Sequence, residues 1–440
     1  MKNRLRVATA AAALLALGGC GIFKGGTKTT PTVGQRVPIL AAENEILADP
    51  SLSGVEVLVP DAAANANWTQ PGGNAAKAMG HLQLAANPAK AWSVEIPGGN
   101  KKERLAAAPT IDENRLVMMD VQGTVHAFAA DTGAKLWTVS TVKGDENKSA
   151  RFGGGASIEG GRVYASNGLG DVVALDATNG TELWRKRPGG PLRGSPGVAN
   201  GQIYVVTQDN QLFALNQTDG EVVWTVSASL ESQGVFGVAA PASAAGTIVA
   251  GFSSGELNAY RYENGRSLWA DVLSRSSIST SVSSLSDIDA EPVIDQGRVY
   301  AVGQGGRMVA MEINSGTRLW EQNIAGISTP WVAGEWIFVV TDDARLMCLS
   351  RGSGKVRWIS QLPGYRNEKK KTNPINWVGP ILAGNRLLLV SSEGDMVSAS
   401  VKDGSVTSTV RTKETLTLPP VVANGTLYLL DDKGRLTAYR

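Results

Sequence analysis

Two carboxylates late in the chain have a spacing that suits cation binding. Asp287 and Asp289 alternate in the stretch Leu285-Ser-Asp-Ile-Asp-Ala-Glu-Pro292, so in an extended segment both side chains point to the same side. Two carboxylates on one side repel each other and favour a cationic partner, such as an arginine that makes charge-assisted hydrogen bonds of about 1.5–3 kcal/mol each. The alternative is that both side chains cap the turn that enters a strand at Pro292. Taken alone, the spacing favours the turn.

Cys20 is a candidate for covalent modification. A basic start (Lys2 to Arg6) is followed by an apolar run from Val7 to Leu17, which is too short to span a bilayer core of about 30 Å. Residues 1–19 are therefore predicted to be a signal peptide. Its end, Leu17-Gly-Gly-Cys20, resembles a bacterial lipobox, which implies cleavage before Cys20 and lipidation of its thiol. The next residue is Gly21 and not Asp, which implies sorting to the periplasmic face of the outer membrane. The alternative is ordinary secretion with an unrelated cysteine.

Few other residues suit catalysis or metal binding. The chain has two Cys and two His, which excludes a disulfide framework and a Cys-rich zinc site. Cys348 lies in the apolar run Arg345-Leu-Met-Cys-Leu349 and is interpreted as a small buried hydrophobic residue. Lys and Arg number 42 against 40 Asp and Glu, so no basic excess favours nucleic-acid binding. We therefore expect no catalytic residue, no metal and no cofactor.

One unit repeats along most of the chain. Its best copy runs from Gly170 to Trp184, Gly-Asp-Val-Val-Ala-Leu-Asp-Ala-Thr-Asn-Gly-Thr-Glu-Leu-Trp. The Val-x-Ala-Leu part alternates as a half-buried strand does, and we expect it to be an inner strand. Asp176 caps the following turn, and Gly180 supplies its positive φ. The Trp then lies on the outer strand, packs between neighbouring blades and donates its indole N–H to a carbonyl.

The number of copies predicts a closed ring. Eight outer-strand positions recur every 38 to 51 residues, which is the blade period of a β-propeller. The last copy stops after its inner strand, and the outer strand that it lacks is found at Lys90-Ala-Trp92. We therefore predict an all-β, eight-bladed propeller of four-stranded antiparallel blades over residues 90–440, with the N- and C-terminal strands closing one shared blade. The outer positions are Trp92, Trp137, Trp184, Trp224, Trp269, Trp320, Trp358 and Ser408.

The chain before the propeller shows no repeat. Residues 20–37 mix Gly, Thr, Lys and Pro and are predicted to be a flexible tether. Residues 38–89 are predicted to be a partly ordered N-terminal segment without a domain of their own.

The repeats resemble the tryptophan-docking repeats of pyrroloquinoline quinone (PQQ) enzymes, which raises an enzyme hypothesis. That class implies an adjacent pair of cysteines against the cofactor, a Ca²⁺ site and an Asp base. This chain has no adjacent cysteines and no recognisable calcium loop. A shared fold does not confer the chemistry. A PQQ-dependent dehydrogenase or quinone-binding propeller is therefore kept as the alternative.

The lipobox and eight repeats together resemble the BamB family, the propeller lipoproteins of the β-barrel assembly machinery. The most specific stretch is Leu285 to Pro292, which is similar to the family's Leu-Ser-Asp-(Val/Ile)-Asp-x-x-Pro. The resemblance implies binding to the periplasmic POTRA domains of BamA and membership of the Bam complex. It implies a binding surface on two loops, one with Asp287 and Asp289 and one within Ser232–Val238. The second loop's candidates are Gln233, Val235 and Phe236, although an arginine found there in some members is absent.

The function hypothesis is a non-enzymatic scaffold. With the resemblance, binding is favoured over capping for the two aspartates, and the partner supplies the arginine. Phe236 is either an interface anchor or part of the rim packing. Direct capture of unfolded outer-membrane proteins at strand edges ranks below scaffolding, since ring closure leaves only short edges. A surface or cell-wall-binding propeller with an unrelated partner is the third hypothesis.

Overall fold

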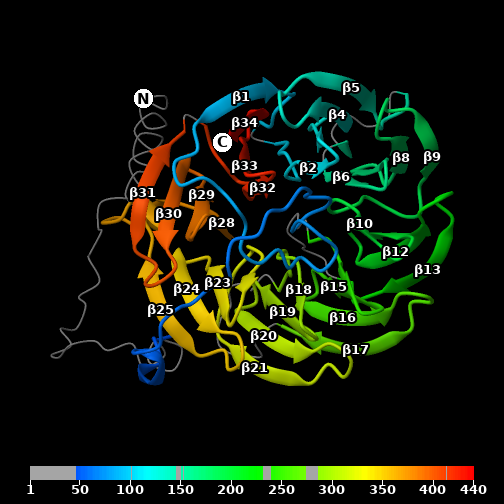
Figure 1. Cartoon of the computed structure of the whole chain (residues 1–440). Helices are drawn as coiled ribbons and strands as arrows, with labels where there is room; N and C mark the ends of the chain where they lie inside the picture. Colours follow the sequence, from blue (N-terminus) through cyan, green and yellow to red (C-terminus); the bar gives the residue numbers. More distant parts are fainter. Residues whose placement is uncertain are drawn as a thin grey trace, which may run out of the picture. The chain divides into compact units, whose positions relative to one another are not determined.

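The repeated hairpins fold into eight four-stranded antiparallel sheets, which stand as blades around one axis (Figure 1). The structure is a computed structural model and describes residues 46–100, 102–144, 150–151, 153–230, 239–273, 286–412 and 414–440. Residues 46–440 belong to one compact unit. No helix within these ranges is long and apolar enough to cross a membrane, and the short 3-10 helix η2 (Pro50–Leu52) precedes the first strand.

Each blade places its four strands in order from the axis to the rim. The first three blades are β2 (Thr110–Asp112), β3 (Arg115–Met119), β4 (Thr124–Ala129), β5 (Lys135–Ser140); β6 (Gly154–Glu159), β7 (Arg162–Asn167), β8 (Val172–Asp176), β9 (Glu182–Lys186); β10 (Gly197–Ala199), β11 (Gln202–Val206), β12 (Gln211–Asn216), β13 (Val222–Ser227). The next three are β14 (Ala242–Ala244), β15 (Thr247–Gly251), β16 (Glu256–Arg261), β17 (Ser267–Val272); β18 (Val293–Asp295), β19 (Arg298–Gly303), β20 (Arg307–Glu312), β21 (Arg318–Gln322); β22 (Trp331–Ala333), β23 (Trp336–Val340), β24 (Arg345–Ser350), β25 (Val356–Gln361).

The last two blades follow a small hairpin. The hairpin and the two blades are β26 (Tyr365–Asn367), β27 (Thr372–Pro374); β28 (Trp377–Ala383), β29 (Arg386–Ser391), β30 (Asp395–Ser400), β31 (Val406–Arg411); β32 (Val421–Ala423), β33 (Thr426–Leu430), β34 (Arg435–Tyr439), β1 (Lys90–Glu95). One expectation needs correction here. The Val-x-Ala-Leu stretches form the third strand of each blade, as β8 does, and the strand nearest the axis is an earlier one of only three residues in most blades.

The two ends of the propeller share one blade, as predicted. β1 pairs antiparallel with β34, with Lys90 opposite Tyr439 and Trp92 opposite Ala438. Trp92 then donates its indole N–H to the Asp131 carbonyl in the first blade, 3.1 Å away. We call the sheet of β32, β33, β34 and β1 the closing blade. Because its outer strand comes from the start of the propeller, the ring is closed by hydrogen bonds.

Seven tryptophans repeat one contact around the rim. Each donates its indole N–H to a backbone carbonyl of the next blade, as Trp137 does to Ala177 at 2.9 Å. Each ring also lies against the turn glycine of that blade: a Cβ at Gly180 would come within 2.8 Å of Trp137. The repeat glycine is therefore required twice, for its φ of +76° and for the space that the indole occupies. The seven are Trp92, Trp137, Trp184, Trp224, Trp269, Trp320 and Trp358.

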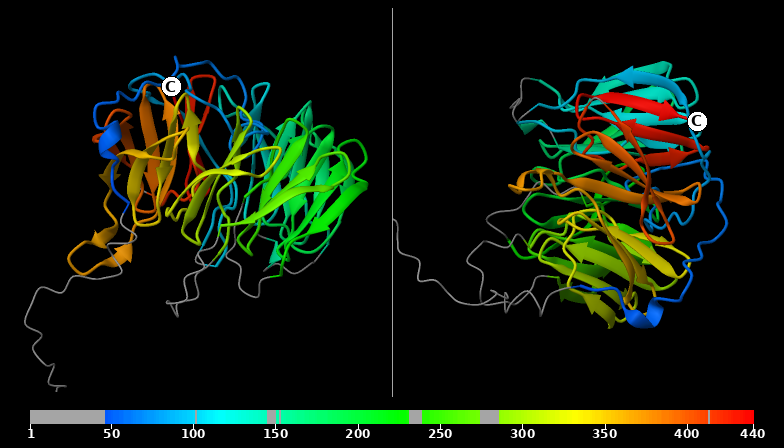
Figure 2. Two further views of the ribbon diagram at one scale, coloured as in Figure 1. Left: turned by 90° about the horizontal axis from the view of Figure 1, so that it is seen from below. Right: turned by 90° about the vertical axis from the view of Figure 1, so that its left-hand side faces the viewer.

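A segment before the propeller winds around one mouth of the ring. We call residues 63–84 the strap; they belong to the blue to cyan chain that lies on one face of the blades in Figure 2. Going along the strap, successive residues bond to the innermost strands of successive blades. The contacts, beginning at the closing blade, are Asn65 to Val422, Trp68 to Ile111, Thr69 to Ile158, Gln70 to Val198, Ala75 to Ser243, Ala76 to Ile294, Gly80 to Trp331 and Leu82 to Leu382.

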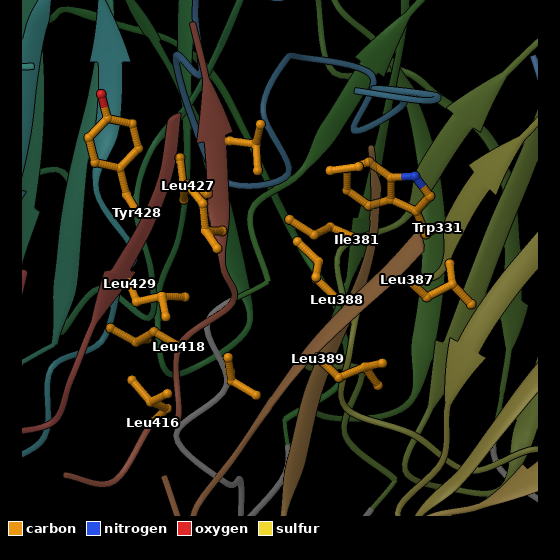
Figure 3. Packing of buried hydrophobic residues seen from close by; sticks show 14 of the residues in the cluster. Trp331, Ile381, Leu387, Leu388, Leu389, Leu416, Leu418, Leu427, Tyr428 and Leu429 are labelled. Carbon is orange, nitrogen blue, oxygen red and sulfur yellow. The ribbon is translucent and has the colours of Figure 1, made fainter. Parts of the chain in front are cut away.

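Apolar packing between blades continues from the strap into the ring. Figure 3 shows Ile381 and Leu388 grouped with Trp331, and Leu418 beside Leu429 of the closing blade. Leu82 and Trp68 of the strap belong to the same cluster of buried side chains. The strap is therefore part of the core of the ring.

Candidate functional site at the centre of the ring

A cavity of about 560 Å³ lies at the axis, beneath the strap. Trp68 of the strap and Trp331 of β22 line it as a stacked pair, with ring centroids 6.4 Å apart and planes 16° from parallel. Further apolar lining comes from residues such as Leu105, Ile381 and Leu418. The lining also includes the exposed Lys102 and Arg104, so the cavity reaches the surface at a basic edge.

Lys77 brings a buried ammonium group to this cavity. Its side chain is 2% exposed, and its backbone holds the left-handed conformation with φ of 62°. Gly72 makes room for the chain, because a Cβ there would lie 2.7 Å from Lys77 Cδ. The ammonium donates to Gln70 Oε1 at 3.3 Å. Burial lowers the pKa of Lys77 to about 8, although the nearby Glu291 carboxylate acts in the opposite direction.

Glu291 is the acidic counterpart of Lys77 in the cavity lining. Its carboxylate accepts a hydrogen bond from the Thr329 hydroxyl, and its backbone N–H donates to Thr329 Oγ1 at 3.1 Å. Burial raises the pKa of this carboxyl, and Lys77 partly offsets that rise. The centre of the ring therefore holds both a poorly solvated cation and a poorly solvated acid.

Asp287 and Asp289 lie together, and Asp289 is part of the lining of the same cavity. Arg193 Nη2 lies 2.7 Å from Asp287 Oδ1 and 3.3 Å from Asp289 Oδ1. Ile288 between them is fully buried and fills space beside Gly251, so the two acids alternate with an apolar side chain as their spacing suggests. The cation that faces them here is thus Arg193 of the same chain. This corrects the expectation that a partner alone supplies the arginine.

The acidic pair is buried, and one guanidinium faces both carboxyl groups. Asp287 is 1% exposed and Asp289 9% exposed, while Arg193 is 5% exposed. Burial and then the charge of Asp287 raise the pKa of Asp289 to about 7, with Arg193 acting against both. Asp287 Oδ2 has no hydrogen-bond partner among the described residues. A buried carboxylate oxygen without a partner is costly, and because this oxygen has almost no accessible surface it can accept a further bond only from a donor that enters the loop.

The other predicted site residues are placed as follows. Cys20, Gln233, Val235 and Phe236 lie outside the described residues, and their roles stay predictions. Cys348 is fully buried on β24, and burial raises the pKa of its thiol. In the described ranges, no three His, Cys, Asp or Glu side chains gather closely enough to hold a metal ion.

Sequence reasoning missed Arg193, Lys77 and Glu291. For Arg193 a signal exists: it lies three residues before Pro196, as Asp289 lies three residues before Pro292. Loops in equivalent positions of two repeats both enter innermost strands, so they converge at the axis. Lys77 has no such signal, because the strap belongs to no repeat.

Comparison with known proteins finds one family over most of the chain. The family model described as outer membrane protein assembly factor BamB matches residues 121–360. BamB of Escherichia coli (strain K12) is 30% identical over 346 residues, which are 78% of this chain and 86% of that protein. BamB of Yersinia pestis is 27% identical over 358 residues, 80% of this chain and 89% of that protein.

Solved structures agree on the fold. BamB from Moraxella catarrhalis superposes with a TM-score of 0.67 at 18% identity, over 80% of this chain and 99% of that chain. A quinohemoprotein alcohol dehydrogenase from Comamonas testosteroni gives a TM-score of 0.66 at 13% identity, over 86% of this chain and 81% of that chain. At these identities the likeness shows the fold alone, since unrelated activities share it.

Proposed function

Because the chain belongs to the BamB family of outer membrane protein assembly factors, we propose that it is a non-enzymatic scaffold of the β-barrel assembly machinery. It supports the folding and insertion of outer-membrane proteins by holding the POTRA domains of BamA. The lipidated Cys20 anchors it at the periplasmic face of the outer membrane. A ring closed by β1 and braced by the strap suits this role, because little conformational entropy is lost when a rigid surface binds a partner.

The observation that carries the partner proposal is the surplus acid at Asp287 and Asp289. One guanidinium faces two carboxylates, and Asp287 Oδ2 lacks a hydrogen-bond partner in the described part of the chain. A basic side chain of BamA that reaches Asp287 Oδ2 gains a charge-assisted hydrogen bond without displacing Arg193, which requires the loop to move because this oxygen is buried in the free protein. Gln233, Val235 and Phe236 form the second part of the proposed surface.

The test separates a direct contact from a structural role of the acids. In D287N/D289N both carboxylates are neutral amides, while R193M removes only the internal cation. We expect D287N/D289N to weaken BamA binding at least about tenfold, which corresponds to one charge-assisted hydrogen bond. We expect R193M to keep more of the binding than D287N/D289N, because Asp287 remains an acid, although loss of Arg193 lets the pKa of Asp289 rise further. Affinity is measured with the purified periplasmic part of BamA.

A triple variant guards against misfolding. R193M/D287N/D289N removes all three buried charges together, so no unpaired ion remains in the loop. It should keep its unfolding temperature and still lose BamA binding. Equal loss of binding in R193M and D287N/D289N would mean that the cluster only shapes the loop. Unchanged binding in all three variants would reject this face.

The anchor is tested by cell fractionation. A C20A variant lacks the thiol that is lipidated. We expect it to leave the outer-membrane fraction and appear in the soluble periplasmic fraction, with its fold unchanged by circular dichroism. Retention of C20A in the membrane fraction would mean that another contact anchors the chain.

The axial cavity supports a second candidate function, that of a quinone-binding propeller. The cavity of about 560 Å³ carries both charged and aromatic lining. Purified protein is mixed with PQQ and Ca²⁺, and bound cofactor absorbance and dye-linked alcohol oxidation are followed. Stoichiometric binding with turnover would establish this function in place of the scaffold.

A further inference from the structure

One of the eight rim positions departs from the tryptophan contact. Ser408 on β31 pairs with Ser398 on β30, and the register shifts directly after that pair. Trp358 on β25 has the same register, opposite Cys348 and before the same shift. Ser408 therefore occupies the position that seven tryptophans fill in the other blades.

The neighbours of Ser408 are also smaller. In the preceding blade, Phe338 is opposite Cys348, and its ring lies 6.1 Å from that of Trp358. The equivalent row across β29, β30 and β31 is Leu388, Ser398 and Ser408. Both aromatic rings of the row are thus absent from this blade.

The next blade explains why the chain does not fill the position itself. Each docked tryptophan meets the turn that joins the third and fourth strands of the following blade, as Trp358 meets Gly404. In the closing blade these strands are β34 and β1, which no turn connects, because they come from opposite ends of the propeller. In place of the turn that would receive an indole from β31, the closing blade has the end of β34 and the start of β1.

A hollow is found at this junction. It measures about 190 Å³, and its lining includes Val410 of β31, Lys90 of β1 and Tyr439 of β34. Val410 is on the same face of β31 as Ser408, since side chains alternate along a strand. Of the charged side chains in the lining, Arg411 lies 3.2 Å from Asp395 and Arg435 lies 2.8 Å from Glu95. Apolar lining comes from Val410, Leu416 and Leu429, so the hollow offers both apolar surface and polar partners, which suits an indole with its one N–H donor.

The edge of this blade is open as well. All six residues of β31 are exposed, and none of Val406 to Val410 is charged. β31 is the last strand of its sheet, so its outer backbone groups face no further strand in the described part of the chain. An uncharged outer strand of this kind accepts a further strand readily.

We propose that the junction between β31 and the closing blade binds an aromatic side chain on an extended segment of a partner polypeptide. The segment runs along the free edge of β31, and its ring leans over Ser408 into the hollow. Side chains of neighbouring strands lie about 4.5–5.5 Å apart, which brings an indole within reach. The seven internal tryptophans show what chemistry the equivalent position takes. This site is separate from the loop that carries Asp287 and Asp289, and it does not depend on the BamA proposal.

The experiment uses a strand of the chain itself as the probe. A peptide with the sequence of Lys355–Gln361 carries 5-fluorotryptophan at the position of Trp358, and ¹⁹F NMR follows its titration with the folded full-length protein. We expect saturable binding to wild type. S408W, which places an indole of the chain in the site, should weaken binding at least about tenfold.

Two controls make the result specific. T409W places the same indole on the other face of β31 and should change the affinity by less than about twofold. A peptide with alanine in place of tryptophan, followed by calorimetry, should bind at least about tenfold more weakly. If S408W does not fold, V410R takes its place, because this half-exposed residue tolerates a charge that blocks the hollow. Absence of binding to wild type, or equal binding to wild type and to the folded blocking variant, would overturn the proposal.

Discussion

At the rim of the ring one contact is repeated seven times, whereas at the centre one segment makes a separate contact with every blade. The rim contact joins an indole, a carbonyl and a glycine, and each copy holds two neighbouring blades. The strap at the centre uses its backbone at some blades and the side chains of Gln70 or Asn65 at others. At the rim, each tryptophan contact therefore joins two neighbouring blades. At the centre, the strap joins all eight blades through one segment. Loss of a rim contact should act locally, while loss of a strap contact should be shared around the ring.

The largest effect is expected at a rim tryptophan. Trp269 is 8% exposed and donates to the Ile313 carbonyl at 2.7 Å. Trp269→Ala should lower the free energy of unfolding by about 3–5 kcal/mol, as for other large aromatic truncations in cores. Urea unfolding gives the value. Ser408→Ala at the eighth position is the matched control and should stay within about 0.5 kcal/mol of wild type. Similar losses in both variants would mean that the indole is not what fastens the blades.

A pH titration tests the burial of Lys77 at the centre. Its pKa is lowered to about 8 in the folded state, so between about pH 8 and 10.5 the unfolded chain binds more protons than the folded chain. Stability from this group therefore rises with pH across that window. Relative to K77M, wild type should gain on the order of 3 kcal/mol between pH 7.5 and 10.5.

The same titration has a control at the surface. Lys135→Met removes an exposed ammonium, and its stability difference from wild type should show no comparable rise. If the stability difference between wild type and K77M also stays constant with pH, the Lys77 ammonium is solvated or fully paired within the cavity.

A pair of glycines separates backbone conformation from indole packing. Gly265 has φ of +68°, and a Cβ there would lie 2.7 Å from Trp224; Gly201 has φ of +72° and nothing within 4 Å of such a Cβ. Gly201→Ala should cost about 1–2 kcal/mol, the price of a left-handed backbone alone. Gly265→Ala should cost about 1–3 kcal/mol more, because the indole must shift. Equal losses would show that the glycine serves only the turn.

The smallest effect is expected at the start of the strap. Asn65 donates to the Val422 carbonyl at 2.6 Å and accepts from the Asn424 amide at 2.8 Å through its own backbone. Asn65→Ala removes only the side-chain bond and should cost about 1 kcal/mol. Hydrogen exchange should then rise at the Asn424 amide and also at strap contacts in other blades, such as Ile111. A rise confined to Asn424 would mean that the strap contacts are independent.

The same contrast explains what could be predicted from the sequence. Blade number, ring closure and the tryptophan contact follow from residues that recur, such as Asp176, Gly180 and Trp184. The innermost strands have only three residues in most blades, as in Val293–Asp295, which is too few to show the alternation that would mark them as the strands nearest the axis. The strap escaped because its contacts depend on the order of the blades in space and on no local pattern.

The loop that carries Asp287 and Asp289 could be predicted only in part. The spacing of Asp287 and Asp289 correctly placed both carboxylates on one side. That spacing alone could not identify Arg193, which is 94 residues away from Asp287 in sequence; only its place three residues before Pro196, which matches that of Asp289 before Pro292, points to it. Nor could spacing identify Lys77 and Glu291, which approach each other only across the cavity.

Joining β1 to β34 also sets an order of events in synthesis. Glu95 and Arg435 are partners that lie 340 residues apart, so the earliest blade strand emerges from the ribosome long before its neighbour exists. Until then β1 is an unpaired edge carrying Trp92, and contacts of such long range form slowly. A chain interrupted anywhere before β34 would keep the edge of β1 unpaired. Chaperones and proteases would bind that edge, whereas in the complete ring β34 covers it.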